Sequence, residues 1–191
     1  LTGPASLTAA RIDVPGDPSS AAFPIIAALS VPGSDVVLEN IMLNRQRDGL
    51  IRVLRDMGGN IDMLNTRQAA GETVADLRVR HSPLRGINVP AAIAPDMIDE
   101  YPALAVAAAI ADGTTHMAGL AELRVKESDR LAAMATGLAA NGVAVESGDD
   151  WLAVTGGPVP GGGTVATHHD HRLAMAVLCL GLAAATPGLI D

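Results

Sequence analysis

Apolar residues recur along this chain in two kinds of helical pattern. Three stretches, residues 16–41, 95–120 and 167–190, open with acidic or hydroxyl-bearing residues and continue as runs of small apolar side chains. Each run leads into a glycine turn and a short β-like segment. Two other stretches, residues 45–59 and 126–142, place apolar residues three and four apart, as amphipathic helices do. Both of these end at glycine, a common helix stop.

The two kinds of stretch alternate, so the chain reads as a repeat of one unit. The turn glycines Gly33, Gly113 and Gly188 lie 80 residues (33 to 113) and 75 residues (113 to 188) apart. A period this long indicates a repeated supersecondary unit, here of order β–α–β–α–β–β. The units span about residues 12–90, 91–160 and, incompletely, 161–191. The sequence therefore predicts an α/β fold of repeated units with a truncated third unit, and we expect further chain after residue 191.

The composition predicts how these helices pack. The apolar helices show no polar face, so we expect them to be buried on all sides, with the amphipathic helices outside them or against sheets. Hydrophobic residues make up 49% of the chain and aromatic residues only 2%. The core must therefore consist of aliphatic side chains and alanine, which favours close approach of helices.

The net charge restricts the partners. A formal charge of −8 argues against a nucleic-acid surface, because phosphate backbones are bound through clustered lysine and arginine. A small anion remains possible where the few basic residues converge. The lone Cys179 permits no internal disulfide, which favours a reducing cytoplasm. The longest apolar run, residues 173–185, is short of the roughly 20 residues of a membrane helix. We read it as a buried helix, and no membrane partner is expected.

The stretch RVKESDR, residues 124–130, carries five charges and the only lysine of the chain, Lys126. If a helix starts near Ser128, then Lys126, Glu127 and Arg130 gather at its N-terminus, where free amides and the helix dipole favour an anion. The alternative is a solvated helix face with pairs between neighbours. The single lysine among twelve arginines weakens that alternative, because lysine and arginine are not interchangeable.

Acidic residues open the apolar helices. Asp96, Asp99 and Glu100 stand at the start of the second one, and their spacing alone favours a capping role over a role in a cleft. We interpret GDPSS at 16–20 as a helix cap in the same position of the first unit. In THHDHRLAM, residues 167–175, three histidines and an aspartate suggest a metal, but no second group completes a ligand set, so none is predicted. Arg172 is more informative, because a buried guanidinium needs an anionic partner.

These motifs resemble a known family. VPGDPSSAAFP, the aspartate of PDMIDEYP, GLAELRVKESDRLAAMATGLAANGV and ATHHDHRLAM are together similar to the 5-enolpyruvylshikimate-3-phosphate synthases, from Ile12 to the end of the chain. The pattern is most similar to the bacterial class that includes naturally glyphosate-tolerant enzymes. The resemblance implies an inside-out α/β barrel of two domains, each of three βαβαββ units, with the active site between them. Residues 1–191 correspond to most of the C-terminal domain.

The resemblance also implies a reaction and its residues. The family transfers the enolpyruvyl group of phosphoenolpyruvate to the 5-hydroxyl of shikimate 3-phosphate and releases phosphate, without metal or cofactor, in aromatic amino-acid biosynthesis. Asp99 matches the aspartate that contacts the attacking hydroxyl, and Lys126 the lysine that bridges both substrates. Glu127 matches the group that exchanges a proton with the methylene carbon. Arg130 and Arg172 match arginines that bind phosphoenolpyruvate.

Several expectations follow from what the chain lacks. The family's N-terminal domain, with its further substrate contacts, is absent, so we expect about half a site and no activity from this chain alone. Glu122 stands where some members have asparagine. Two alternatives remain: an enzyme similar to the UDP-N-acetylglucosamine enolpyruvyl transferases, whose reactive loop would lie in the other domain, and a non-catalytic module of the same fold. Retention of all five matched residues argues against the module.

Overall fold

The computed structural model describes residues 3–4, 6 and 8–191, in which helices and strands alternate in a repeating order. The first group of elements is α1 (Pro18–Ser30), β1 (Asp35–Met42), α2 (Gly49–Asp56), β2 (Asn60–Ala69) and β3 (Glu72–Arg80). The second is β4 (Asn88–Val89), α3 (Tyr101–Ile110), β5 (Thr114–Ala118), α4 (Arg130–Ala140), β6 (Ala144–Ser147) and β7 (Trp151–Thr155). The last is β8 (Val159–Gly161), β9 (Thr164–Val165), α5 (His171–Gly181), β10 (Ala184–Thr186) and β11 (Leu189–Ile190). The predicted α/β fold class is confirmed.

The two larger sheets share one topology. The second group forms a four-stranded sheet of order β4-β5-β7-β6, in which β4 and β5 are parallel and the other pairs are antiparallel. The first group forms β1-β3-β2, again antiparallel, and a parallel bridge from Gly16 to Ile41 stands in the place of β4. In the last group β8 and β9 pair in parallel with β10 and β11. Each parallel pair is joined through one of the apolar helices.

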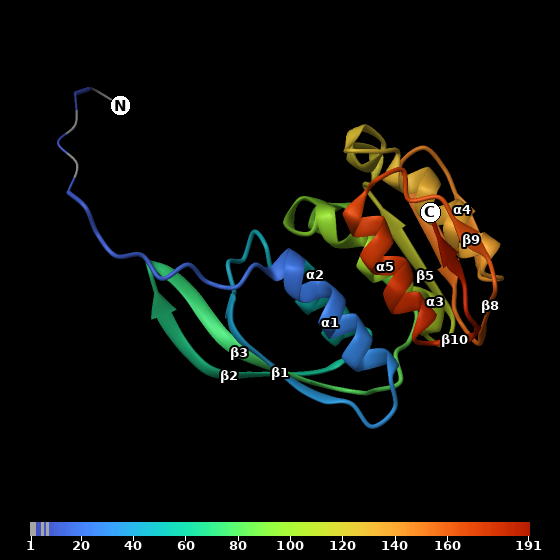
Figure 1. Ribbon diagram of the computed structural model, residues 1–191, viewed down its shortest axis with the longest axis horizontal. Helices are drawn as coiled ribbons and strands as arrows, with labels where there is room; N and C mark the ends of the chain where they lie inside the picture. The colour runs from blue at the N-terminus through green and yellow to red at the C-terminus, as the bar shows by residue number, and fades with distance from the viewer. Residues whose placement is uncertain (1–2, 5, 7) are drawn as a thin grey trace.

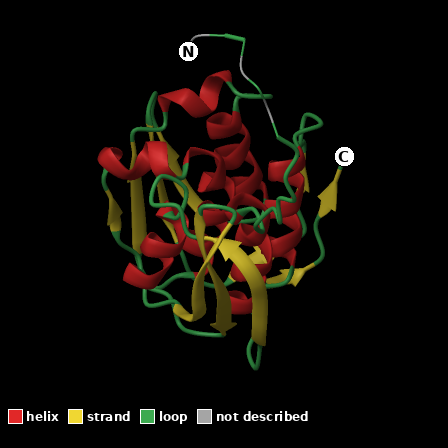
Figure 2. Cartoon of the chain, turned by 90° about the vertical axis from the view of Figure 1, so that its left-hand side faces the viewer, coloured by secondary structure: helices red, strands yellow, loops and turns green. Residues whose placement is uncertain are grey.

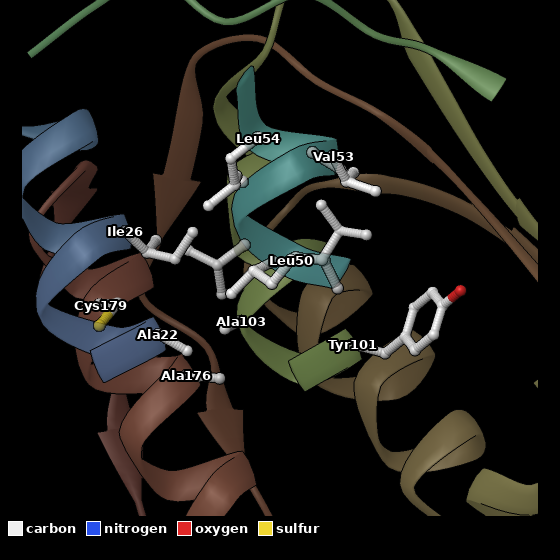
Figure 3. Close-up of a cluster of buried hydrophobic side chains, with 14 of the residues drawn as sticks. Ala22, Ile26, Leu50, Val53, Leu54, Tyr101, Ala103, Ala176 and Cys179 are labelled. Carbon is white, nitrogen blue, oxygen red and sulfur yellow. The ribbon is translucent and has the colours of Figure 1, made fainter. Parts of the chain in front are cut away.

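The apolar helices α1, α3 and α5 pack against one another in the interior, and the sheets lie around them (Figures 1 and 2). Nine of the ten α3 residues are buried, and five of these are alanines that allow neighbouring helices to approach closely. Figure 3 shows Ala22 and Ile26 of α1 beside Ala176 and Cys179 of α5. The expectation of an aliphatic and alanine core holds. None of the described helices is long and apolar enough to span a bilayer.

The prediction that all three apolar helices are buried on all sides is wrong for α1, which exposes Ser20 and Pro24, and more clearly wrong for α5. Leu173, Ala176, Cys179 and Leu180 are buried, but Leu178 is 63% exposed. Leu182, just after the helix, is also largely exposed. Only one face of α5 packs on α1, α3 and α4, and no described segment covers the other face. The sequence pattern could not show this, because both faces of α5 are apolar.

Only one of the amphipathic helices begins later than expected. Helix α2 begins at Gly49 rather than near Arg45, whereas α4 begins at Arg130 with the cap residue Asp129, next to the expected start at Ser128. Both end as predicted, because Gly58 and Gly142 adopt left-handed φ angles of 97° and 79°. The buried sides of both helices face the apolar helices, as expected of an outer layer.

The core holds one phenol whose hydroxyl is unsatisfied. Tyr101 is fully buried, its hydroxyl has no hydrogen-bond partner among the described residues, and burial raises its pKa to about 12 (Figure 3). Burying a polar group without a partner opposes folding. We therefore expect Tyr101→Phe to increase the free energy of unfolding by about 1 kcal/mol, as measured by urea denaturation. A loss of stability of similar size would instead indicate a buried water bound to the hydroxyl.

Candidate functional site

Asp99 is the centre of a cluster that joins three parts of the chain. Its carboxylate lies 3.0 Å from Arg130 Nη1, 3.5 Å from Lys126 Nζ and 3.7 Å from Arg172 Nη2. Asp99 belongs to a 3-10 turn, Ile98–Glu100, that leads directly into α3. Arg130 opens α4, and Arg172 lies in the first turn of α5. The starts of these three helices therefore meet, and all five matched residues are linked, because Glu127 joins the cluster through Arg130.

The acidic residues before α3 do not cap it, so the capping interpretation is wrong. No side chain makes a cap hydrogen bond at the start of α3. Asp96 accepts a hydrogen bond from Arg52 of α2, and Asp99 faces the three cations. Since the chain winds as 3-10 turns up to Glu100, the helix begins only after the acidic residues have turned toward other elements. The GDPSS cap is confirmed, since Asp17 accepts from the amides of Ser19 and Ser20.

Lys126 lies between a 3-10 turn, Ala121–Val125, and the start of α4. Its Nζ is 2.6 Å from Glu122 Oε1, in addition to its contact with Asp99. The hydrogen bond to Glu122, followed by the charges of Asp99 and Glu122, raises the pKa of Lys126 against a smaller opposing effect of burial. The ammonium is therefore charged at neutral pH. A compact cation on the exposed side of Asp99 is suited to contact an anion and a hydroxyl together.

Arg130 is the most enclosed cation of the site, with a side chain that is 0% exposed. Its Nε donates to Asp170 Oδ2 at 2.7 Å, and its two other nitrogens donate to Asp99 and Glu127. Burial opposes ionisation, but the hydrogen bond and charge of Asp170, together with the charges of Glu127 and Asp99, outweigh it, so the pKa of Arg130 is raised. The guanidinium is thus held by three carboxylates, and its main role within the described residues is to join α3, α4 and α5.

Asp170 is the site residue that sequence reasoning missed as a partner of Arg130. Its carboxylate is fully buried, caps α5 through the amides of Arg172 and Leu173, and accepts from Arg130. Burial opposes its ionisation, but these hydrogen bonds and the charge of Arg130 hold its pKa below the usual range. Its position just before an apolar helix is typical of a cap, a signal that could have identified that part of its role. Its contact with a residue 40 positions earlier left no sign in the sequence.

Arg172 differs from Arg130 in what its guanidinium contacts. Its side chain is 17% exposed, and its nearest carboxylate oxygens are Asp99 Oδ2 at 3.7 Å and Glu100 Oε1 at 3.8 Å. At these distances the groups attract one another as ions but are too far apart for hydrogen bonds. Within the described residues the guanidinium donates no hydrogen bond, so its donors are available to a ligand. Arg172 is therefore better placed than Arg130 to bind an added anion directly.

Glu127 lies at the exposed edge of the charge cluster, next to a cleft. The Glu127 side chain is 56% exposed and reaches Arg130 from the solvent side. A cleft of about 450 Å³ runs between α4 and β9 and is bordered by Glu127, Ser128 and His168. It includes none of Asp99, Lys126, Arg130 and Arg172, so the charge cluster rather than this cleft is the candidate site. Among the described residues no group of three or more His, Cys, Asp or Glu side chains is arranged for a metal ion.

The cluster as a whole carries more negative than positive groups. Three cations contact five carboxylates: Lys126, Arg130 and Arg172 against Asp99, Glu100, Glu122, Glu127 and Asp170. An anion that binds here must compete with carboxylates of the protein. The exposed ones, Glu122 and Glu127, can turn away at little cost, whereas Glu100 and Asp170 are buried.

Comparison with known proteins assigns this arrangement to a family. The whole chain, residues 1–191, matches the family described as EPSP synthase (3-phosphoshikimate 1-carboxyvinyltransferase). The chain is 64% identical over 193 residues to the 3-phosphoshikimate 1-carboxyvinyltransferase of Methylobacterium sp. (strain 4-46) and 59% identical over 194 residues to that of Maricaulis maris (strain MCS10). Each alignment covers 100% of this chain and 43% of the relative, so the chain spans less than half the length of these relatives.

Comparison with solved structures supports the same family. An EPSP synthase from Acinetobacter baumannii superposes with a TM-score of 0.92 at 39% identity, over 100% of this chain and 44% of that one. The enolpyruvyl transferase NikO from Streptomyces tendae shares the fold, with a TM-score of 0.61 at 21% identity over 91% of this chain and 37% of that one. With its whole length matched and its structure shared, this chain belongs to the EPSP synthase family.

Proposed function

We propose that this chain supplies the Asp99 side of an active site that transfers the enolpyruvyl group from phosphoenolpyruvate to the 5-hydroxyl of shikimate 3-phosphate. The observation that carries this proposal is the contact of one carboxylate, Asp99, with Lys126, Arg130 and Arg172. Two of these cations remain partly accessible, as a site for two anionic substrates requires. The whole enzyme would act in the cytoplasm, in the shikimate pathway of aromatic amino-acid biosynthesis.

Each side chain has a role that its surroundings support. Asp99 would take the proton of the attacking hydroxyl as oxygen bonds to the central carbon of phosphoenolpyruvate. Glu127, on the solvent side, would give a proton to the methylene carbon and take one back as phosphate leaves, which restores the double bond. Lys126 would bridge the two substrates, and Arg172 would bind phosphoenolpyruvate. Preorganised cations of this kind stabilise charge that develops in the transition state.

Arg130 would contribute chiefly by positioning. Its guanidinium is fully buried and engaged by Asp99, Glu127 and Asp170, so an incoming anion would have to displace Glu127 to reach it. We propose that residues 1–191 form most of a C-terminal domain, and that an N-terminal domain closes over the cluster. Positioning two anions in a closed cleft needs both sides, so this chain alone would be inactive.

The proposal predicts activity for a chimera in which residues 1–191 replace the matching segment of the Methylobacterium relative. At 64% identity the segment should fold in that context. We expect the chimera to release phosphate from phosphoenolpyruvate only when shikimate 3-phosphate is present, while the isolated chain releases none. Release driven by UDP-N-acetylglucosamine would show a different acceptor. A folded but inactive chimera would favour a non-catalytic module.

A further inference from the structure

Glu100, which has no assigned role, is a buried carboxyl directly behind the site. Its side chain is 4% exposed, and its Oε1 has no hydrogen-bond partner within the described residues. The nearest cationic atom is Arg172 Nη1 at 3.8 Å, too far for a hydrogen bond. An ionised carboxylate oxygen in this position is poorly stabilised, because burial removes water and no donor replaces it. Protonation is the simplest way to relieve that cost.

The groups around Glu100 act on its ionisation in both directions. Ser19 at the start of α1, Arg47 before α2 and Arg172 on α5 favour the ionised form, while burial and the adjacent Asp99 oppose it. Burial is the largest effect, and the pKa of Glu100 is raised. Arg47 is already paired with Asp17. Arg172 is therefore the cation whose interaction with Glu100 a bound anion would change.

Glu100 is also within reach of protons from solvent. It lines a cleft of about 230 Å³ together with Arg47, Asp96 and Asp99. An anion on Arg172 would bring a second negative charge close to Glu100 and draw the guanidinium away from it. Both changes disfavour the carboxylate.

We propose that Glu100 takes up a proton from solvent when an anion binds Arg172, and that this carboxyl sets how the affinity of the site depends on pH. The inference rests on the anion-binding role proposed for Arg172. By linkage, anion affinity is highest at low pH and falls as the pH rises through the range in which Glu100 loses its proton. Glu100 acts here as a positioning residue, since it would reach the anion only through Arg172.

The test uses the 191-residue chain and sulfate, which stays a dianion over the pH range studied. We expect the dissociation constant for sulfate, from NMR titrations between pH 4.5 and 8, to rise about tenfold across the window. In Glu100→Gln most of this increase in the dissociation constant should be lost. Histidine side chains also ionise over this range, so the quantity that decides is the difference between the two proteins. Glu146→Gln, a change at an exposed carboxylate of β6, should behave like the unmodified chain.

A second measurement follows the Glu100 carboxyl directly in the unmodified chain. The ¹³C shift of the Glu100 carboxyl carbon, followed against pH, should show a midpoint that moves upward when sulfate is added. If sulfate binding depends on Arg172 but the midpoint does not move, the role of Glu100 is overturned and the anion role of Arg172 stands. The same holds if binding in Glu100→Gln depends on pH as strongly as in the unmodified chain. Sulfate binding that Arg172→Ala leaves unchanged overturns both this inference and the anion role of Arg172 in the proposed function.

Discussion

Asp170→Ala should lower the free energy of unfolding of this chain by about 3–5 kcal/mol, the cost of removing one partner of a buried ion pair. The Arg130 side chain is completely enclosed, and Asp170 is its one fully buried partner, at 2.7 Å from Arg130 Nε. The same substitution also removes the cap of α5. Urea denaturation monitored by circular dichroism measures the change.

Asp17→Ala is a matched control for this substitution. Asp17 also caps a buried helix, α1, and also pairs with an arginine, Arg47, but both side chains are nearly half exposed. We expect a loss of only about 1 kcal/mol, the usual value of a cap. Equal losses in the two variants would show that enclosure of the Arg130 pair adds nothing to stability.

The low pKa of Asp170 gives the same pair a pH signature. A carboxyl whose folded-state pKa lies below its unfolded value of about 3.9 adds stability above that value. This stability is lost as the pH falls through the folded-state pKa. The gap in stability between the unmodified chain and Asp170→Asn should therefore narrow when unfolding is measured at progressively lower pH below 4.

Lys126→Ala should lower the turnover of the chimera on the order of 1,000-fold, because it removes a fixed positive charge where charge develops in the reaction. Lys126→Arg should also be strongly impaired. The Nζ of Lys126 lies between Glu122 and Asp99, and a planar guanidinium cannot take the place of this compact cation. Steady-state phosphate release with both substrates saturating measures the effect.

Arg55→Ala controls for loss of a positive charge as such. Arg55 is exposed in the last turn of α2, away from the cluster, and turnover should stay within twofold of the unmodified chimera. If Lys126→Arg retained full turnover, the single lysine of the chain would have no special chemical role. The proposed bridge between substrates would then need only a positive charge.

The sequence predicted most of the fold because its helices are of two clearly different kinds. Periodicity separated α2 and α4 from the apolar helices, and the glycine stops placed their ends within a residue or two. It could not predict the exposed face of α5, because Leu178 is as apolar as the buried Leu180. An apolar helix face tends to be buried, but only the tertiary structure shows whether another segment covers it.

Five members of the candidate cluster could be predicted from the sequence, but neither Asp170 as a sixth nor the contacts between them could be. Local spacing brought Lys126, Glu127 and Arg130 to one helix start, and the repeat brought Asp99 and Arg172 to two others. Which carboxylate holds which cation depends on contacts between segments far apart in the chain. For that reason spacing alone favours a cap for Asp99, and the resemblance gives Arg130 and Arg172 the same role although only Arg130 is enclosed.

The contacts of Arg130 have a consequence for the order in which the chain acquires its site. They join positions separated by 31 and 40 residues, to Asp99 and Asp170. Closing loops of this length costs chain entropy that local contacts do not. The cluster should therefore form late in folding, after α3 and α5 have come together on α4. A partly folded molecule would hold a solvated arginine and scattered carboxylates, with helices but without the assembled charge cluster.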